Sequence, residues 1–323
     1  MINLSIILGK PSTSLKLAPI APIFKLGDPY VPQNYRPISI LPFLGNFFER
    51  CIYNRLYDFS IKFSLFTSKQ FGFLRNKSTS LAIANLTEYL YDVLDSRDIS
   101  CNIFIDLRKA FDTIPHRILL NKLELYGIRG LPLDLLTDYL TDRLHCVRIG
   151  NTTSSPRPIN IGVPQGSILG PLLFILYIND LPNISNLFHP TIFADDTTIS
   201  IRDSSPTELV LKCNDVLEKL HDWTTCNRLS INYEKTFYML TTNQTFTEPF
   251  GNISINGHEL DFRSEGKFLG IIFDNKLKFN HHTKYICNKI SKSIGIIHRL
   301  KAFLPTRCLF SLYHSFIYPY LTY

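Results

Sequence analysis

Residues 191–201 read TIFADDTTISI, two short runs of β-branched and aromatic residues on either side of Asp195-Asp196. Runs of this composition, separated by a polar pair, predict a β-hairpin folded at the two aspartates. Residues 101–106 read CNIFID and predict a buried strand that ends at Asp106. The sequence thus places carboxylates at the ends of strands that lie far apart in the chain.

Helical patterns separate and follow these strands. A helix is expected over residues 165–179, entered through Gly166-Ser167, and a second helix begins at Ser205-Pro206-Thr207-Glu208. That second start combines a capping box with a proline in the first helical position. Residues 236–240 then return as a strand. The order strand, helix, hairpin, helix, strand predicts the split βαβ arrangement within an α+β fold.

In a split βαβ sheet, the strand that ends at Asp106 and the hairpin can be neighbouring central strands. Three carboxylates at adjacent strand ends repel one another unless cations neutralise them. Such hard oxygen ligands suit Mg²⁺, which combines few protein carboxylates with water and substrate phosphates. Two such ions can activate a hydroxyl group and stabilise a departing pyrophosphate. The alternative is that Asp195 and Asp196 are solvated turn residues, because an Asp-Asp pair is common in turns.

The flanking sequence predicts further elements. Six prolines between positions 19 and 42 indicate extended segments and turns, and helical patterns follow over residues 43–63 and 81–94. Residues 253–260 contain an Asn-Gly turn signal and predict a second hairpin. Residues 280–302 predict a basic amphipathic helix whose inner face carries Ile286, Ile290, Ile294 and Ile297.

Positive charge is concentrated near the C-terminal end. The net charge is +7, and residues 275–323 hold 8 of the 34 lysines and arginines but none of the 27 aspartates and glutamates. The preceding residues are therefore close to neutral. A basic face of this kind either binds phosphate backbones or is a solvated helix face, and charge alone does not decide between the two.

Composition and cysteine spacing exclude several classes of protein. A hydrophobic content of 45% and a charged content of 19% are typical of a globular chain. Seven dispersed cysteines without a C-x-x-C pair indicate reduced thiols in an intracellular protein, with neither a disulfide framework nor a zinc cluster. The longest apolar run, residues 168–178, is too short to span a membrane, and residues 1–10 lack the charged start of a secretory signal.

Seven motifs in a fixed order resemble those of reverse transcriptases. The x-A-D-D box is residues 193–196, the first aspartate motif is residues 104–112 (FIDLRKAFD), and a G-x-P-Q-G-S loop opens residues 162–171. The others are residues 23–28 with 34–39 (NYRPIS), 70–75 (QFGFLR), 229–236 (LSINYEKT) and 268–270 (FLG). The set covers about residues 20–275 and is most similar to the Jockey-type non-LTR retrotransposons (LINE elements) of arthropods.

The resemblance implies a metal site and a sugar gate. Asp106 and Asp195 would be the principal ligands of two Mg²⁺ ions, or of Mn²⁺ in their place, with Asp196 as the third carboxylate and the backbone of Leu107 as a further ligand. Phe111 lies five positions after Asp106, where the family places a bulky gate against the ribose 2′-hydroxyl. The plainer interpretation is that Phe111 is an ordinary core residue. The two roles are compatible, because a gate residue is also packed.

The resemblance also implies a nucleotide pocket. Gln165 would touch the incoming nucleotide, and Gly166 would let the backbone approach it closely; the plainer interpretation is a helix start capped by Ser167. Lys25 and Arg36 are candidates to grip the triphosphate, since arginine binds phosphate through paired hydrogen bonds and lysine as a point charge. Solvated loop charges are the alternative for both.

Other residues receive roles outside the pocket. Lys235 is a candidate general acid for pyrophosphate departure, although a lone lysine before a strand is usually just exposed. Asp112 with Thr113 is expected to cap a helix that runs to about Tyr126. The primer grip would be a turn formed by Phe268, Leu269 and Gly270, and the template–primer backbone would contact Lys284, Lys289, Lys292 and Arg299.

The implied activity is RNA-directed DNA polymerisation, in which a primer 3′-hydroxyl attacks a deoxynucleotide. The expected partners are an RNA template, a DNA primer and dNTPs, with no membrane and no obligate protein partner. RNA-dependent RNA polymerases typically show G-D-D and a polar residue in place of Phe111, which argues decisively against them. Group II intron proteins share the motifs, but NYRPIS and residues 110–116 (AFDTIPH) favour a LINE-type enzyme.

The expected fold is a right-hand polymerase. Residues 1–98 would form the fingers and palm-supporting helices, residues 99–275 a ferredoxin-like palm with a nucleotide-pocket insert near 113–167, and residues 276–323 a partial helical thumb. The family usually carries an endonuclease ahead of the polymerase and further sequence behind it, so the thumb is interpreted as truncated. A remnant that binds RNA or DNA without efficient polymerisation is therefore the non-enzyme alternative. The expected locations are a cytoplasmic ribonucleoprotein and the nucleus.

Overall fold

The computed structural model describes residues 15–244 and 251–322. Residues 1–10, for which the sequence predicts no secretory signal, lie outside these ranges. No helix of the described chain has both the length and the apolar character needed to cross a membrane.

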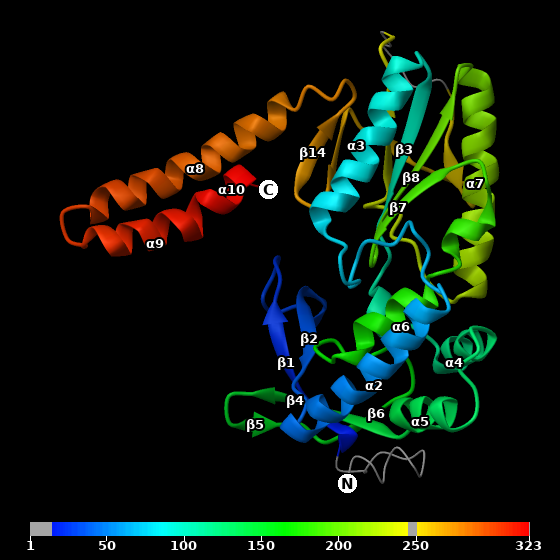
Figure 1. The fold of residues 1–323 in the computed structure, drawn as a ribbon, viewed down its shortest axis with the longest axis vertical. Coiled ribbons are helices and arrows are strands. Elements are labelled where there is room, and N and C mark those ends of the chain that lie inside the picture. Colours follow the sequence, from blue (N-terminus) through cyan, green and yellow to red (C-terminus); the bar gives the residue numbers. More distant parts are fainter. Residues whose placement is uncertain (1–14, 245–250, 323) are drawn as a thin grey trace.

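One five-stranded sheet dominates the upper body of the molecule (Figure 1). Its strand order is β12 (Asp261–Phe262), β9 (Phe237–Thr241), β3 (Ile99–Ile105), β8 (Asp196–Asp203) and β7 (His189–Phe193). β3 pairs antiparallel with both β8 and β9, and β7 pairs antiparallel with β8. With helix α6 (Leu169–Tyr177) before β7 and helix α7 (Pro206–Cys226) before β9, this is the split βαβ arrangement that the sequence predicts.

β3 is buried over its whole length because helices cover both faces of the sheet. Successive side chains of a strand point to opposite faces. Ile103 packs in the same core as the buried residues of α7, whereas Phe104 packs with those of α3 (Thr79–Asp95). The resulting two-sided core holds the strand that leads to Asp106 rigidly in place.

The β-hairpin predicted at residues 191–201 is present, but its turn lies one position earlier than expected. Phe193 pairs with Asp196, so the turn residues are Ala194 and Asp195, and Asp196 is the first residue of β8. Ala194 adopts a left-handed backbone conformation with φ of 54°. Sequence composition predicted the hairpin correctly but did not predict which two residues form its turn.

The lower body combines helices with a second sheet (Figure 1). Helix α2 (Phe43–Lys62) and the almost fully buried α6 pack against each other, and α4 (His116–Leu125) contacts both α5 (Leu131–Leu140) and α6. The sheet has the order β2 (Tyr35–Ser39), β1 (Leu17–Phe24), β4 (Arg143–Ile149) and β5 (Thr152–Thr153), and β6 (Arg157–Ile159) also pairs with β4.

Three helix predictions need correction at their ends. α6 begins at Leu169 rather than near residue 165. α4 begins at His116 with Pro115 at its N-cap, so Asp112 does not cap it. Ser205 is the N-cap of α7, but its side chain makes no capping hydrogen bond, so the predicted capping box does not form. Glycine and proline signals locate a helix start only to within a few residues.

Two small hairpins complete the upper body. β10 (Ser254–Ile255) and β11 (His258–Glu259) join through Asn256-Gly257, as the Asn-Gly signal predicts. β13 (Glu265–Phe268) and β14 (Ile271–Asp274) join through Leu269-Gly270.

The C-terminal helices form an arm that extends away from the body (Figure 1). They are α8 (Asn280–Leu300), α9 (Thr306–Phe316) and α10 (Tyr318–Thr322). The prediction that four isoleucines of α8 lie inside was wrong: α8 has no buried residue, and Ile294 is 52% exposed. The helix is amphipathic, but its main contacts are with α9 and β14, so its apolar side is only partly covered.

Candidate active site

The sheet register brings the predicted aspartates together. Ile105 of β3 pairs with Thr197 of β8, so the next positions along the two strands are Asp106 and Asp196. Asp195 lies in the adjoining turn between β7 and β8. Antiparallel pairing of β3 with β8 therefore converts two distant motifs into one cluster of carboxylates.

The electrostatics of this cluster favour a bound cation. Partial burial raises the pKa of Asp195 and the carboxylate of Asp106 raises it further, while Arg36 and Lys25 act in the opposite direction. Desolvation, followed by the charges of Asp195 and Asp106, raises the pKa of Asp196 to about 6, although part of its side chain remains exposed. A cation placed among these groups would relieve their mutual repulsion.

The donor set suits Mg²⁺ with ligands supplied from outside the protein. Within residues 15–244 and 251–322, no three His, Cys, Asp or Glu side chains converge into a ready-made metal site. Mg²⁺ is usually held by one or two carboxylates, with water and substrate phosphates completing its shell. Asp106, Asp195 and Leu107 line the same cleft, whereas Asp196 lies outside its lining.

Asn232 holds Asp106 and was not assigned a role from the sequence. Its Nδ2 donates to Asp106 Oδ2 at 2.8 Å, and its backbone N–H donates to the carbonyl oxygen of Asp106, also at 2.8 Å. Thr236 Oγ1 accepts a weaker bond from the Asp106 N–H at 3.3 Å. These contacts fix one carboxylate oxygen and leave the other available to a ligand. The available signal was the position of Asn232 within the LSINYEKT motif.

One cleft of about 1650 Å³ runs between the two bodies of the molecule. Nine of the residues with a predicted metal or nucleotide role line it, and these are Lys25, Arg36, Asp106, Leu107, Phe111, Gln165, Gly166, Asp195 and Lys235. The side chains of Lys25 and Arg36 are exposed, and their charges act on Asp195. The cleft therefore brings carboxylates and cations together in one lining.

Phe111 is held between two other rings. It stacks on Phe174 of α6 with ring centroids 4.2 Å apart, and the ring of Phe73 meets it edge-on at 6.3 Å. Phe111 is only partly buried and faces the cleft. The ring is thus at once a packed residue and a wall of the cleft.

The Gln165–Ser167 loop is shaped by contacts within the protein. Gln165 Nε2 donates to Asp112 Oδ1 at 2.8 Å, which gives Asp112 a role in orienting Gln165 instead of capping a helix. Gly166 has a φ of +99°, and a Cβ added there would lie 2.7 Å from the carbonyl oxygen of Ser39. The glycine is therefore required by the fold itself. Ser167 Oγ accepts from the Gly170 N–H at 2.8 Å and so caps the first turn of α6.

A buried glutamate supports this loop from behind. Glu49 of α2 is 2% exposed, and its Oε2 accepts from the N–H groups of Ile168 at 2.7 Å and Leu169 at 3.3 Å. Its Oε1 accepts from the hydroxyl of Tyr139 at 2.6 Å. The carboxylate thus neutralises the positive N-terminal end of α6. No motif around Glu49 marked these contacts, because its partners lie 90 to 120 positions away in the sequence.

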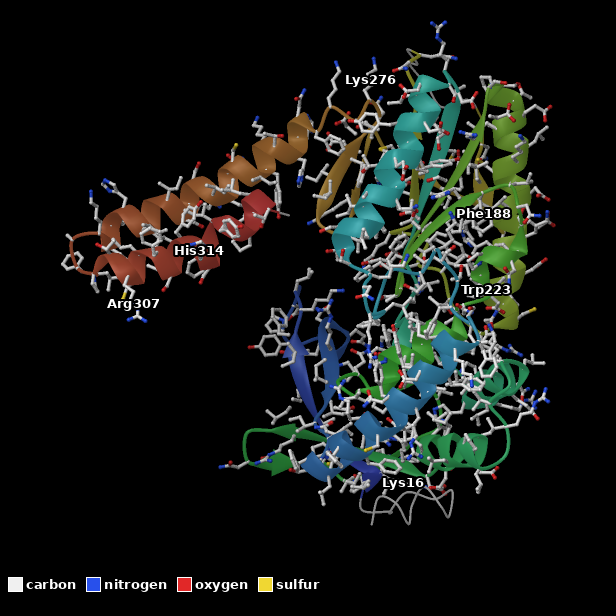
Figure 2. All side chains as sticks on the ribbon, viewed as in Figure 1. Lys16, Phe188, Trp223, Lys276, Arg307 and His314 are labelled. Atoms are coloured by element: carbon white, nitrogen blue, oxygen red, sulfur yellow. The ribbon has the colours of Figure 1, made fainter. Side chains whose placement is uncertain are left out.

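The remaining predicted residues lie outside the cleft. Phe268 is buried in the core with Phe104 and Phe237, and Leu269-Gly270 form the turn after it. Figure 2 shows side chains projecting from the helical arm, and the exposed residues of α8 include Lys284, Lys289, Lys292 and Arg299. Their predicted contacts with primer and template remain predictions.

The sequence of this chain is similar to those of known polymerases. Residues 23–273 match the family described as "Reverse transcriptase (RNA-dependent DNA polymerase)". Over 286 residues the chain is 34% identical to the "Probable RNA-directed DNA polymerase from transposon BS" of Drosophila melanogaster, a match that covers 83% of this chain and 30% of that protein. It is 29% identical over 319 residues to the "RNA-directed DNA polymerase from mobile element jockey" of the same species, covering 95% of this chain and 34% of that protein. The chain spans about a third of the length of these relatives.

A solved structure shares the fold. "Structure of apo telomerase from Candida Tropicalis truncated from C-terminal domain" superposes with a TM-score of 0.56 at 13% identity, covering 83% of this chain and 55% of that chain. At this identity the likeness concerns the fold alone. It confirms the predicted α+β, right-hand polymerase architecture.

Proposed function

We propose that this chain, which belongs to the reverse transcriptase (RNA-dependent DNA polymerase) family, copies an RNA template into DNA by extending a primer with dNTPs. Its relatives confirm the resemblance to jockey-like non-LTR retrotransposon enzymes. The observation that carries the proposal is the shared cleft, in which Asp106 and Asp195 lie with Lys25, Arg36 and the Gln165-Gly166 loop.

The acidic and basic residues of the cleft would have different roles. Asp106 and Asp195, with Asp196 beside them, would hold two Mg²⁺ ions, which supply activation of the primer 3′-hydroxyl and stabilisation of the leaving pyrophosphate. Lys25 and Arg36 would bind the triphosphate, since they provide exposed positive charge near Asp195. Lys235 lines the same cleft and is the candidate to donate a proton to pyrophosphate.

Phe111 is proposed to exclude ribonucleotides. Its ring is fixed by Phe174 behind it and by Phe73 at its edge, so it cannot easily move aside for a 2′-hydroxyl. Rigid apolar walls select against an added group through overlap. The Gln165–Asp112 hydrogen bond would hold the neighbouring loop in the shape that receives the nucleotide.

The wider organisation follows the same proposal. Residues 1–98 would act as fingers and palm-supporting helices, residues 99–275 as palm with the nucleotide-pocket insert near 113–167, and residues 276–323 as thumb. The arm carries exposed basic residues and would grip the template–primer backbone through Lys284, Lys289, Lys292 and Arg299. Phe268, Leu269 and Gly270 would contact the primer end. The expected setting is a cytoplasmic ribonucleoprotein that also reaches the nucleus.

Primer extension tests the proposal directly. The chain is incubated with a primed RNA template, Mg²⁺ and dNTPs, and Asp195→Ala serves as the inactive control. We expect primer extension from the unmodified chain and none from the variant. Salt-dependent RNA binding without extension by the unmodified chain would instead support a remnant that binds nucleic acid only.

A further inference from the structure

A short segment before α3 extends the catalytic sheet beyond its edge strand. The N–H of Phe71 donates to the carbonyl of Ile192 at 2.8 Å, and the N–H of Ile192 donates to the carbonyl of Lys69 at 3.0 Å. Ile192 belongs to β7, the last strand of the five-stranded sheet. Residues 69–72 therefore run parallel to β7 and reach the catalytic turn at its end.

Within this segment, the side chain of Gln70 is aimed at the turn. Gln70 is 1% exposed, and its Oε1 accepts from the N–H of Ala194 at 3.0 Å and from the N–H of Gly72 at 2.8 Å. Ala194 directly precedes Asp195 and is itself buried. A buried backbone N–H needs an acceptor, and here a side chain from a distant segment supplies it.

The turn that Gln70 holds is strained. Ala194 has a φ of 54°, a left-handed conformation that costs a non-glycine residue free energy unless its surroundings impose it. The approach of the two segments is also close, because a Cβ added to Gly72 would lie 2.6 Å from the backbone nitrogen of Ala194. Only glycine at position 72 permits this distance.

We propose that Gln70 is a positioning residue that sets the catalytic turn so that the Asp195 carboxylate faces the cleft. Gln70 does not line the cleft and acts through Ala194. The same segment continues to Phe73, whose ring touches Phe111, so it also joins the turn to the sugar-facing wall. The expected effect on catalysis rests on the proposed polymerase function. The positioning of the turn by Gln70 does not depend on that function.

The test compares three variants. Gln70→Met keeps the length of the side chain and removes the acceptor, whereas Gln70→Glu retains an acceptor of the same reach. Thr224→Val is the matched control, because Thr224 is buried in α7, away from the cleft, and its hydroxyl makes one hydrogen bond to the carbonyl of His221. Urea unfolding measures the stability of each variant, so that a loss of activity caused by general destabilisation can be distinguished from a loss caused by the missing acceptor.

Catalytic measurements form the first arm. Gln70→Met should lower kcat about 10–100-fold and raise the Mg²⁺ concentration needed for half-maximal extension, with the KM for dNTP changed less than about 3-fold. Gln70→Glu should recover part of the loss, and Thr224→Val should match the unmodified chain. Unchanged kinetics in Gln70→Met, or a loss equal to that of Thr224→Val, would overturn the proposal.

Hydrogen exchange forms the second arm and requires no activity. In the metal-free protein, the amide of Ala194 should exchange at least about 10-fold faster in Gln70→Met than in Thr224→Val, because its acceptor is gone. Unchanged protection of Ala194 would refute the positioning role. If the unmodified chain fails to extend a primer but Ala194 loses protection in Gln70→Met, the proposed function fails while the structural inference holds.

Discussion

Replacing Glu49 by leucine should destabilise the protein and weaken nucleotide binding at the same time. Leucine has a similar volume, so the change removes hydrogen-bond acceptors without opening a large cavity. The hydroxyl of Tyr139 and the N–H of Ile168 lose short bonds of 2.6 and 2.7 Å, and the N–H of Leu169 loses a longer one of 3.3 Å. All three groups then lose their carboxylate acceptor and lie beside an apolar side chain.

The size of the effect follows from these contacts. A hydrogen bond to a charged group contributes about 1.5–3 kcal/mol, so the two short bonds together account for roughly 3–6 kcal/mol. That is a large part of the 5–15 kcal/mol by which a domain is typically stable. Glu49→Gln should cost only about 1 kcal/mol, because its carbonyl can still accept from Ile168 and its amide can donate to the Tyr139 oxygen.

The functional consequence should appear in KM. Loss of the cap loosens the start of α6 and with it the Gln165–Ser167 loop, so the KM for dNTP should rise about 10-fold in Glu49→Leu. Leu217→Ala is the control, because Leu217 is fully buried in α7 and its truncation costs a comparable 2–5 kcal/mol away from the loop. Urea unfolding measures stability, and steady-state extension measures KM. A loss below about 1 kcal/mol in Glu49→Leu, or an equal KM change in both variants, would refute this reasoning.

Three further predictions concern the cleft. Phe111→Ala should raise the incorporation of ribonucleotides relative to deoxynucleotides at least about 10-fold, while the affinity for template changes less. Primer extension with competing nucleotides measures the selectivity, and filter binding measures the affinity. Unchanged sugar selectivity would contradict the gate role of Phe111. Asn232→Ala should lower single-turnover kcat about 10-fold with little change in the KM for dNTP, because Asp106 loses the donor that orients it, and an unchanged rate would contradict that role. Without metal, the free energy of unfolding should fall as pH rises from about 4 to 6, since the folded state holds the Asp196 proton, with a pKa of about 6, more tightly than the unfolded chain does. Urea unfolding in EDTA should show a flatter profile for Asp196→Asn, and an identical profile would show that this carboxylate is not the cause.

Local patterns in the sequence were sufficient to predict the secondary structure around the site. The buried strand up to Asp106, the hairpin at residues 191–201 and the helix from Pro206 are all present. Each depends on the spacing of apolar residues or on turn chemistry within a few positions. The predicted ends of some elements were displaced by one or a few residues, as in the turn at Ala194-Asp195 and the start of α6. The reason is that neighbouring strands and buried caps decide where an element begins and ends.

Side-chain partners could not be predicted in the same way. Glu49 accepts from α6 and Gln70 accepts from Ala194 across more than a hundred positions, and local sequence does not indicate which distant N–H will be the donor. Asp112 illustrates the same point, since its local context suggested a helix cap and its actual partner is Gln165.

The sequence by itself determined which carboxylates this protein offers and that they stand at strand ends. Only the tertiary structure decided that β3 lies between β8 and β9, so that Asp106 meets Asp195 in one cleft. It also decided that none of the isoleucines of α8 is fully buried. The physical reason is that periodicity specifies the apolar side of an element, whereas burial depends on what else packs against that side.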